Sequence, residues 1–541
     1  MNLLNDTFIK SHGLNARRIR LHQRRILQAL RNEINTEISI KNACSVQDGS
    51  IIAWNIVAKI LSTHTSDCLN WQQNHLVGCI PAAGAASRFF LELQHFVNAV
   101  RQQIEQNLEL NPLSLQEQFA FLPSLVRHAG HPNVEYSSIL VTYDFCCNLI
   151  ENYSLKPKLI VPATLEGDTF LKLKIEEQIN LISSLGTTLV VPNSMKKEIQ
   201  QILYQLKPKE YEKWLVLEQD NKLSTVRFLR NGEPLLDENG KYSIVSAGHG
   251  ELLHIFDNIA DNFPQAHCLH IRNIDNIIGT TQQRKQELNI PTNLFYNLRK
   301  ILEAIRKKIP CINFHSPTIQ DKELSEMLLF ISKIILPNED FRGNTEINCK
   351  SMYNLFSKLF HWQPLAENMS NIEIWKLILE NCERPLSVLG VVKKEKGDVG
   401  GGPVFAKVSD GNNIKLCMEM PHATPEDAKE FFSDTGKTAY FNPVLVFFEL
   451  RTHTNSNTNT GKKVNFVQLF DERFWLLSKR EYKGIPVCYH ETVLYELIGN
   501  SATTNLVFVE VPRSLFKPHK SYLDCLEQNR ESYGFNKNFE P

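Results

Sequence analysis

The stretch that decides the fold of this chain is Val77-Gly78-Cys79-Ile80-Pro81-Ala82-Ala83-Gly84-Ala85-Ala86-Ser87-Arg88. An apolar run ending at Ile80 predicts a buried strand, and the apolar pattern after Arg88 predicts a helix. Between them lie small residues, whose backbone N–H groups can approach a phosphate closely beside the positive end of a helix dipole. Arg88 can meet the same phosphate with two hydrogen bonds. Small residues also occur where a helix packs tightly on a sheet, so this stretch alone leaves both interpretations open.

The composition is that of an ordinary folded protein. The chain has 541 residues, enough for one large core or a few domains of ordinary size. Lysine plus arginine and aspartate plus glutamate each number 59, so the formal net charge is zero. A neutral chain is not expected to bind nucleic acid, and any phosphate site must therefore be local.

The cysteines and apolar runs bear on the compartment. The 12 cysteines include no C-x-x-C pair and none at zinc-finger spacing to histidine. Scattered cysteines of this kind predict free thiols in a reducing compartment. The first residues show no signal-peptide pattern, and no apolar run reaches the length that spans a membrane. We therefore expect a soluble cytoplasmic protein.

Four regions are predicted along the chain. A helical extension over 1–75 is followed by an α/β core over 76–283, where strands alternate with helices and predict a mostly parallel sheet. Residues 284–380 have a helical pattern, and residues 381–541 form a strand-rich region. Strands are expected at 139–143, 159–161, 188–191, 267–271, 388–392, 404–408, 444–450, 464–470 and 506–511. Helices are expected at 170–185 and 195–206, and an exposed hairpin loop at 451–463.

The N-terminal extension is rich in arginine. Six arginines lie beside apolar residues at helical spacing, namely Arg17, Arg18, Arg20, Arg24, Arg25 and Arg31. We favour a solvated helix face, which is the usual place for such a run of charge. The alternative is a surface for an anionic membrane or a partner.

Two further motifs supply a lysine and a glycine-flanked histidine. In Lys156-Pro157-Lys158 the proline restricts the backbone that carries Lys158, whose ammonium can act as a point charge on a phosphate. In Ser246-Ala247-Gly248-His249-Gly250-Glu251-Leu252, two glycines permit a backbone that exposes amides to hydroxyls or phosphate. Taken singly, the lysine is by default an exposed loop residue, and the glycines are also consistent with a tight turn.

Two more motifs follow predicted strands. Asn273-Ile274-Asp275-Asn276 places a carboxylate where α/β enzymes hold Mg²⁺ against a nucleotide, and an Asx turn is the alternative. The last motif, Val511-Pro512-Arg513-Ser514-Leu515-Phe516-Lys517-Pro518-His519-Lys520, is a basic segment stiffened by proline. Its Lys520 is a second candidate lysine for phosphate.

Taken together and in this order, the five motifs resemble those of the UTP–glucose-1-phosphate uridylyltransferase and UDP-sugar pyrophosphorylase superfamily. The segment 511–520 is the most specific of them. The chain is even more similar to a bacterial family of undetermined function that shares this core. That family has a similar Asn-Ile-Asp-Asn block, a Gly-Gly-Gly-Pro block, here 400–403, and an Asn-Pro block, here 442–443. The resemblance extends over about residues 77–526.

This resemblance implies a glycosyltransferase-A-type nucleotidyltransferase core. An oxygen of a sugar 1-phosphate would attack the α-phosphorus of a nucleoside triphosphate, with UTP as the expected nucleotide, and pyrophosphate would leave. Catalysis would rest on positioning and on neutralising phosphate charge, without a covalent residue. The motifs specify neither the sugar nor the oligomeric state.

The resemblance also implies roles for individual residues. The catalytic residues would be Arg88, Lys158 and Lys520, and Asp275 would hold Mg²⁺ as the cofactor. The substrate-binding residues would be Gly84, Ser87, Gly248, His249, Gly250, Asn273 and Arg513. Gly400–Gly402 would be either a second anion-binding nest or a turn.

Two departures from the family pattern support an alternative function. Alanines occupy most of the first loop, where the enzymes have a glycine-rich run, and a methyl group hinders any position that needs a positive φ. The second acid that often follows the Asp-Asn pair is replaced by Thr280, Thr281 and Gln282. The alternative is a catalytically weakened protein that binds a nucleotide or sugar phosphate in a regulatory or effector role.

Overall fold

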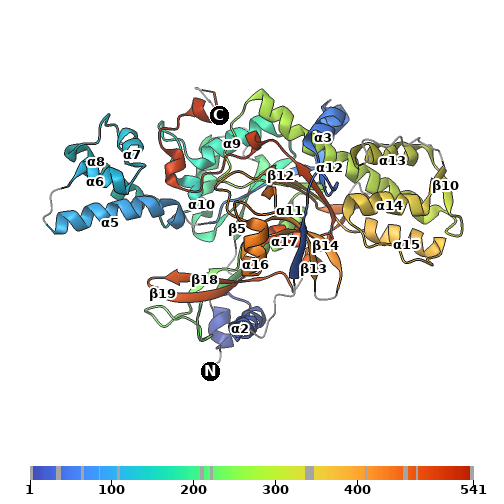
Figure 1. Ribbon diagram of the computed structural model, residues 1–541, viewed down its shortest axis with the longest axis horizontal. Helices are drawn as coiled ribbons and strands as arrows, with labels where there is room; N and C mark the ends of the chain where they lie inside the picture. Colours follow the sequence, from blue (N-terminus) through green and yellow to red (C-terminus); the bar gives the residue numbers. More distant parts are fainter. Residues whose placement is uncertain are drawn as a thin grey trace. The chain divides into compact units, whose positions relative to one another are not determined.

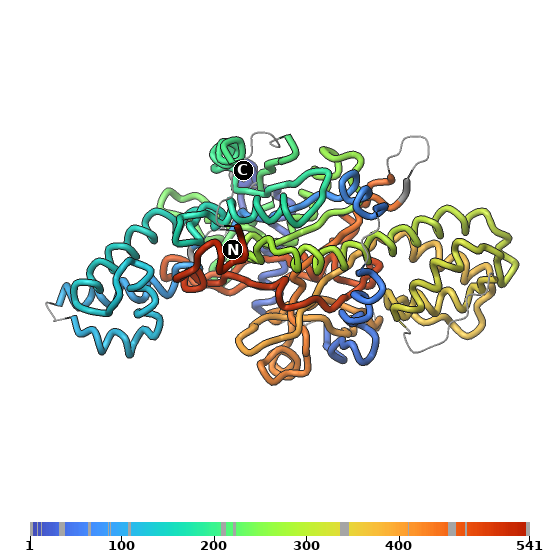
Figure 2. Tube along the Cα trace, turned by 90° about the horizontal axis from the view of Figure 1, so that it is seen from above, coloured from blue at the N-terminus to red at the C-terminus, as the bar shows by residue number. Residues whose placement is uncertain are grey.

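The chain divides into two compact units, each built from three stretches. Unit 1 comprises Met1–Val77, Gln219–His270 and Asn289–Pro512, and unit 2 comprises Gly78–Glu218, Ile271–Leu288 and Arg513–Pro541. Figures 1 and 2 show the elements of both units. The computed structural model describes residues 4–11, 13–31, 38–62, 66–84, 86–106, 110–206, 212–219, 223–335, 346–408, 411–454, 461–470 and 473–536. The division predicted from the sequence, at 75, 283 and 380, stays a prediction.

Unit 1 contains a sheet with neighbouring strands in the order β2-β20-β12-β15-β9. These strands are β2 (Ile51–Ile52), β20 (Asn505–Glu510), β12 (Leu386–Lys393), β15 (Tyr440–Glu449) and β9 (Cys268–Ile271). Strand β20 runs parallel to both β2 and β12, whereas β12 and β15 are antiparallel. Nearly every residue of β12 and β15 is buried, as expected of strands covered on both faces.

Smaller sheets surround this one in unit 1. Strand β13 (Gly402–Val408) pairs antiparallel with β1 (Ile38–Ala43) and β14 (Asn413–Met418), and β19 (Ile485–Glu491) with β18 (Leu476–Tyr482) and β7 (Phe228–Leu229). Two-stranded pairs are β6 (Ser224–Val226) with β8 (Ile244–Ser246), β10 (Thr318–Gln320) with β11 (Glu346–Asn348), and β16 (Arg451–Thr454) with β17 (Gly461–Lys463).

The helices of unit 1 include a group that packs side by side, α13 (Lys322–Ile335), α14 (Cys349–Phe360) and α15 (Asn371–Cys382) (Figure 1). This group confirms the helical pattern predicted after residue 284. The other helices are α1 (Asp6–Ser11), α2 (Ala16–Leu30), α3 (Trp54–Leu61), α4 (Ser66–His75), α11 (Leu252–Asn262), α12 (Gln282–Lys308), α16 (Pro425–Asp427) and α17 (Leu494–Ile498). Most of α12 belongs to unit 1, and its first turns belong to unit 2.

Unit 2 has three neighbouring strands in the order β3-β4-β5, namely β3 (Leu76–Pro81), β4 (Gly186–Pro192) and β5 (Trp214–Gln219). Its helices are α5 (Leu91–Glu105), α6 (Pro112–Gln118), α7 (Leu122–His128), α8 (Tyr136–Tyr153), α9 (Phe170–Leu181), α10 (Lys196–Leu206) and α18 (Arg530–Tyr533). The C-terminal stretch shares the core of these helices through Tyr522, Cys525, Leu526, Tyr533 and Phe535. Residues more than 400 positions apart in sequence therefore share one apolar interior.

The predicted fold class is confirmed as α/β with a mostly parallel sheet in unit 1, an N-terminal helical segment and a strand-rich C-terminal region. The strands predicted at 188–191, 267–271, 388–392, 404–408, 444–450 and 506–511 are present, as are the helices α9 and α10. The two strands of the predicted hairpin, β16 and β17, are present, and residues 455–460 lie outside the described residues. All 12 cysteines are free thiols. In the described ranges, no helix is long and apolar enough to cross a membrane.

Three predicted strands are wrong, and one of them is a long helix. Residues 139–143 belong to α8, which begins with a capping box between Glu135 and Ser138. Its buried residues Ile139, Thr142, Cys146 and Leu149 recur every three or four positions, so the helical period of the whole segment overrides its local strand propensity. Residues 158–160 and 466–469 form short 3₁₀ turns instead of strands.

The N-terminal region also differs from the prediction. Strands β1 and β2 interrupt its helices, because both pair with strands far along the chain, β13 and β20. Four of the six arginines are exposed, which confirms the solvated face for Arg17, Arg20, Arg24 and Arg31. Arg18 and Arg25 are half-buried and pair with Glu251 and His490, respectively.

Candidate functional site

The small-residue loop leaves the end of β3 and leads through a 3₁₀ turn over Ser87–Phe90 into α5. Ala82 donates a hydrogen bond from its N–H to Val190 O at 2.8 Å, and Ala86 donates to Lys156 O at 3.0 Å. Lys158 N donates to Gly84 O at 3.4 Å, so the loop lies directly against the Lys-Pro-Lys segment. The described loop residues 82–84 and 86 have no positive φ, so alanine does not strain this backbone.

Lys158 is the best-defined of the predicted catalytic residues. Its side chain is 12% exposed, and its ammonium nitrogen lies 4.0 Å from Asp275 Oδ2. The ammonium also donates to His519 O and stands 4.0 Å from the centroid of the Phe89 ring. Burial lowers the pKa of Lys158 to about 8, although the nearby Asp275 carboxylate opposes this shift. The site therefore holds a partly desolvated cation whose charge titrates near neutral pH.

Asp275 lies on the loop that follows β9. Arg272 N, at the start of this loop, donates to Cys79 O of β3 at 3.0 Å. The Asp275 loop and the small-residue loop therefore begin side by side. Asp275 O accepts hydrogen bonds from His519 N at 2.9 Å and from His519 Nδ1 at 3.1 Å. The carboxylate itself is 30% exposed and is free to meet a ligand from solvent.

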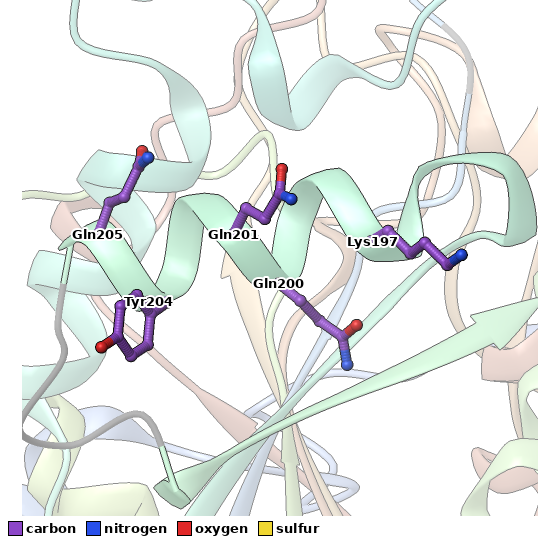
Figure 3. Close-up of a pocket in the computed structure, with 5 residues that line it drawn as sticks. All are labelled: Lys197, Gln200, Gln201, Tyr204 and Gln205. Carbon is purple, nitrogen blue, oxygen red and sulfur yellow. The ribbon is translucent and has the colours of Figure 1, made fainter.

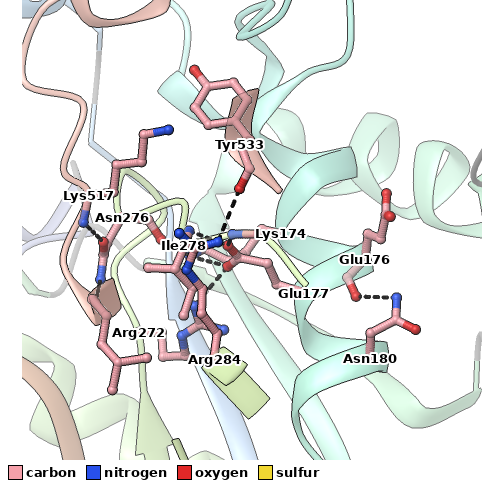
Figure 4. A network of polar contacts seen from close by, with 12 residues as sticks. Lys174, Glu176, Glu177, Asn180, Arg272, Asn276, Ile278, Arg284, Lys517 and Tyr533 are labelled. Atoms are coloured by element: carbon pink, nitrogen blue, oxygen red, sulfur yellow. Dashed lines mark hydrogen bonds and ion pairs between the residues drawn. The ribbon is translucent and has the colours of Figure 1, made fainter. Parts of the chain in front are cut away.

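A buried ionic network beneath the loop holds it in place (Figure 4). Glu177 of α9 accepts hydrogen bonds from Arg272 Nη2 at 2.8 Å, from Lys174 Nζ at 2.9 Å and from Gly279 N at 2.8 Å. Lys174 also donates to Asn276 O. The two buried cations lower the pKa of the Glu177 carboxyl against the effect of its burial.

The C-terminal segment is tied to the same loop. Asn276 Oδ1 accepts from Lys517 N at 2.8 Å, and Asn276 Nδ2 donates to Leu515 O at 3.0 Å (Figure 4). A single side chain thus fixes the segment that carries His519 and Lys520. The interpretation of Asn273–Asn276 as a mere Asx turn does not account for these long-range bonds.

The other predicted residues of unit 2 are more exposed. Lys520 is exposed, its N–H is bound by Asp524 Oδ2 at 2.7 Å, and its charge contributes to the lowered pKa of Lys158. Arg88 and Asn273 are exposed, and Arg513 lies over the Phe516 ring at 4.8 Å. The Ser87 side chain lies outside the described residues. The structure therefore brings together Lys158, Asp275 and the backbone before Lys520, whereas contacts of the Arg88 and Arg513 side chains with Asp275 stay a prediction.

Gly248, His249 and Gly250 lie in unit 1, and their part in the site stays a prediction. Gly248 has φ +96°, and a Cβ there would lie 2.3 Å from Thr492 O, so only glycine fits. Gly250 N donates to Thr492 O at 3.0 Å, and His249 Nδ1 accepts from Leu494 N at 3.1 Å. Close packing on residues 491–494 explains the glycines, and the accepting Nδ1 leaves the ring proton on Nε2.

The Gly-Gly-Gly-Pro block of unit 1 also packs closely. A Cβ at Gly401 would lie 1.7 Å from Met418 O, which favours the turn over a nest open to an anion. Nearby, Asn442 Nδ2 donates to Glu419 Oε1 at 3.0 Å, and Glu496 accepts from Glu419 N at 2.9 Å and contacts His422 Nδ1 at 2.8 Å. Within the described ranges, the buried Asn442 Oδ1 has no hydrogen-bond partner.

Sequence reasoning missed Lys174, Glu177 and Arg272, although a signal exists. Charged residues at positions 172, 174, 176 and 177 crowd one short helical segment, and Lys174 and Glu177 are three positions apart on one face. Lys174 and Glu177 are fully buried, which only the packing of α9 under the loop reveals.

The side chains around Asp275 suit a magnesium ion only if the oxygens of a bound substrate complete its coordination. Across the residues that the structure describes, no group of three or more His, Cys, Asp or Glu side chains is arranged to hold a metal. Mg²⁺ is commonly held by one or two carboxylates together with substrate phosphates and water, and Asp275 can supply one such carboxylate.

A hollow of unit 2, of about 650 Å³, borders α10. Figure 3 shows that its described side chains, Lys197, Gln200, Gln201, Tyr204 and Gln205, project to different sides of the helix instead of converging. None of the predicted site residues lines it, so it has no part in the candidate site.

Residues 191–531 match the model of a family described as Domain of unknown function (DUF4301). The chain belongs to this family. The predicted membership of a family of undetermined function is thereby confirmed. No curated protein matches the sequence.

Several solved structures are similar to this chain. One is the UDP-glucose pyrophosphorylase from Leishmania major, solved in open and closed structures, with a TM-score of 0.48 and 13% identity over 96% of this chain and 77% of that one. Another is UDP-glucose phosphorylase from Trypanosoma brucei, with a TM-score of 0.48 and 13% identity over 96% of this chain and 77% of that one.

Proposed function

We propose that the protein is a nucleotidyltransferase that makes a nucleotide-diphosphate sugar and pyrophosphate from a nucleoside triphosphate and a sugar 1-phosphate. UTP is the nucleotide that we expect it to use. The single observation that carries the proposal is the meeting of three distant segments at one point of unit 2. The Lys158 ammonium lies 4.0 Å from the Asp275 carboxylate and donates to His519 O, next to Lys520. A phosphate-sized anion with a divalent cation is the ligand that such a pair of charges suits.

The chemistry requires only positioning and charge. A phosphate oxygen of the sugar 1-phosphate attacks the α-phosphorus, the bond from that phosphorus to the bridging oxygen breaks, and pyrophosphate leaves with the electron pair. Lys158 donates its remaining N–H groups to the phosphate oxygens on which charge develops, and Lys520 adds a second cation from the exposed side. Asp275 would hold Mg²⁺, which supplies positive charge to the phosphates when it is bound.

The buried network gives this arrangement its rigidity. Glu177, Lys174 and Arg272 hold the Asp275 loop before any ligand arrives, and Asn276 holds the segment before Lys520. Charges fixed in advance need no reorganisation during the reaction, which is the condition for strong electrostatic catalysis.

Pyrophosphate release tests this proposal. The purified protein is mixed with Mg²⁺, one nucleoside triphosphate and one sugar 1-phosphate from a panel, and pyrophosphate is measured. We expect turnover with at least one pair, a loss of about 100-fold or more for Lys158→Met, and nearly unchanged turnover for the exposed Lys156→Met. A panel that yields neither pyrophosphate nor nucleotide binding contradicts the proposal.

A second candidate is a binding protein with weakened catalysis. The observation that favours it is the sparse set of metal ligands, since the described residues contain no group of three or more His, Cys, Asp or Glu side chains that could hold a metal ion. In that case nucleotide binds without turnover, and Asp275→Ala lowers affinity alone. If Asp275→Ala abolishes a measurable turnover, the enzyme is favoured.

A further inference from the structure

Unit 1 contains a hollow of about 330 Å³ that the proposed function does not use. It is bordered by the C-terminal end of α14, by β13 and β14, and by the turn at 48–50. The polar residues that line it are Asp48, Ser50, Ser357, Lys358, His361 and Lys415. Its volume falls in the lower range of pockets that hold small molecules.

Lys415 is the unusual member of this lining. The residue is 2% exposed, and its ammonium donates one hydrogen bond, to Leu359 O at 3.0 Å. Among the described residues, no carboxylate lies within ion-pair distance of it, and the Phe508 ring lies 5.6 Å away. Buried ammonium groups are normally paired with an anion, because an unpaired charge is costly to remove from water. Burial lowers the pKa of Lys415 to about 8, so the group still carries its proton at pH 7 for most of the time.

The groups around Lys415 leave the hollow positive. Asp48, the one acid of the described lining, accepts from Ser50 N at 2.8 Å and from the Ser50 hydroxyl, and its charge raises the pKa of Lys415 against burial, so two lysines face a single carboxylate. Lys358, an exposed residue in the last turn of α14, adds a second ammonium. Burial and the Lys415 charge lower the pKa of His361 to about 4, so its ring is neutral at pH 7 and can donate an N–H to an anion.

We propose that this hollow binds a phosphate monoester, with the Lys415 ammonium as the buried counter-charge and with Lys358 and His361 as further donors. Lysine acts as a compact point charge on phosphate, and a phosphate group offers enough oxygens to accept from Lys415, Lys358 and His361 together. The hollow is larger than a phosphate group alone, so it has room for a small organic part. This binding site is independent of Lys158 and of the proposed reaction.

Inorganic phosphate is the first probe, measured by isothermal titration calorimetry at constant ionic strength with chloride as the reference anion. We expect saturable binding that persists in Lys158→Met, because that variant removes only the unit 2 cation. Binding at this hollow is expected to be lost in Lys415→Met, a change that also relieves a buried charge and should therefore not unfold the protein. Circular dichroism and a cooperative thermal transition confirm that the variant is folded.

A second pair of variants tests the proposal even if the Lys415→Met protein does not fold. Lys358→Gln changes an exposed residue of the lining and is expected to weaken phosphate binding about twofold to fivefold. Lys350→Gln changes an exposed lysine at the other end of α14, outside the lining, and is expected to leave affinity unchanged.

The same titrations with ribose 5-phosphate and glucose 6-phosphate separate two sources of the ligand. Tighter binding of a monoester than of inorganic phosphate supports the proposed monoester, whereas equal or weaker binding contradicts it and indicates the free ion. The proposal is overturned if folded Lys415→Met binds phosphate as the wild type does, or if the Lys158→Met protein binds none.

Discussion

At the scale of single residues, the pKa of Lys158 controls how the candidate site responds to pH. Phosphate binds the protonated amine, so affinity for a nucleoside triphosphate is expected to be level below the pKa of about 8 and to fall above it. The fall should approach about tenfold per pH unit, because one proton is then taken up on binding. Titration of the protein with nucleotide, followed by fluorescence or calorimetry between pH 6 and about pH 10, measures how the affinity depends on pH.

Lys158→Arg is the control for this profile. A guanidinium keeps its proton across the whole range, so the decline above pH 8 should flatten even if the affinity at pH 7 is lower. A wild-type profile that stays level to high pH would show that Lys158 does not bind the phosphates.

Asp275 influences the pH at which the affinity for nucleotide begins to fall. Its carboxylate raises the pKa of Lys158 against burial, so Asp275→Asn should lower the pKa of Lys158 further and move the decline in affinity to lower pH. The experiment is done without divalent cations, which separates the electrostatic role of Asp275 from its proposed role as a magnesium ligand. An unchanged midpoint would mean that the two side chains do not interact in solution.

At the scale of elements, α9 supports the Asp275 loop through Glu177. Glu177→Gln leaves Lys174 and Arg272 buried without their anion, and we expect a loss of about 3–5 kcal/mol in the free energy of unfolding. Urea denaturation measures this loss. Glu198→Gln, on the exposed face of α10, should change stability by less than about 0.5 kcal/mol.

A loss of stability confined to unit 2 would also reduce nucleotide affinity, because Asp275 depends on the network for its position. If Glu177→Gln unfolds like the wild type, the ionic network contributes little, and the loop is held by its backbone bonds to 515–519 instead.

At the scale of the whole molecule, unit 2 depends on the last segment of the chain. A variant that ends at Pro512 loses the apolar side chains of Tyr522, Tyr533 and Phe535 from the core and the His519 carbonyl from Lys158. We expect increased binding of the dye ANS, proteolysis within unit 2 and no nucleotide binding. Removal of only 537–541 is the matched control and should leave all three properties unchanged.

Two of the incorrect predictions of local structure concern elements whose form depends on residues far away in the sequence. Residues 139–143 have strand propensity, yet the burial of one face of α8 in the core outweighs it. Strands β1 and β2 have no local signal of their partners, because β13 and β20 lie more than 350 positions away. Motif order, by contrast, predicts that Lys158, Asp275 and the segment up to Lys520 lie together, and in unit 2 the Lys158 ammonium meets both Asp275 and His519 O.

The sequence by itself determined the α/β class, most strands of the sheet and the chemistry of the candidate residues, because periodicity and side-chain type are local properties. Only the tertiary structure decided that Lys158 meets Asp275, that Glu177 holds their loop and that Lys415 is buried with no carboxylate of the described residues within ion-pair distance. Those facts depend on which distant segments share an interior, and the energy of a buried charge is set by its neighbours in space.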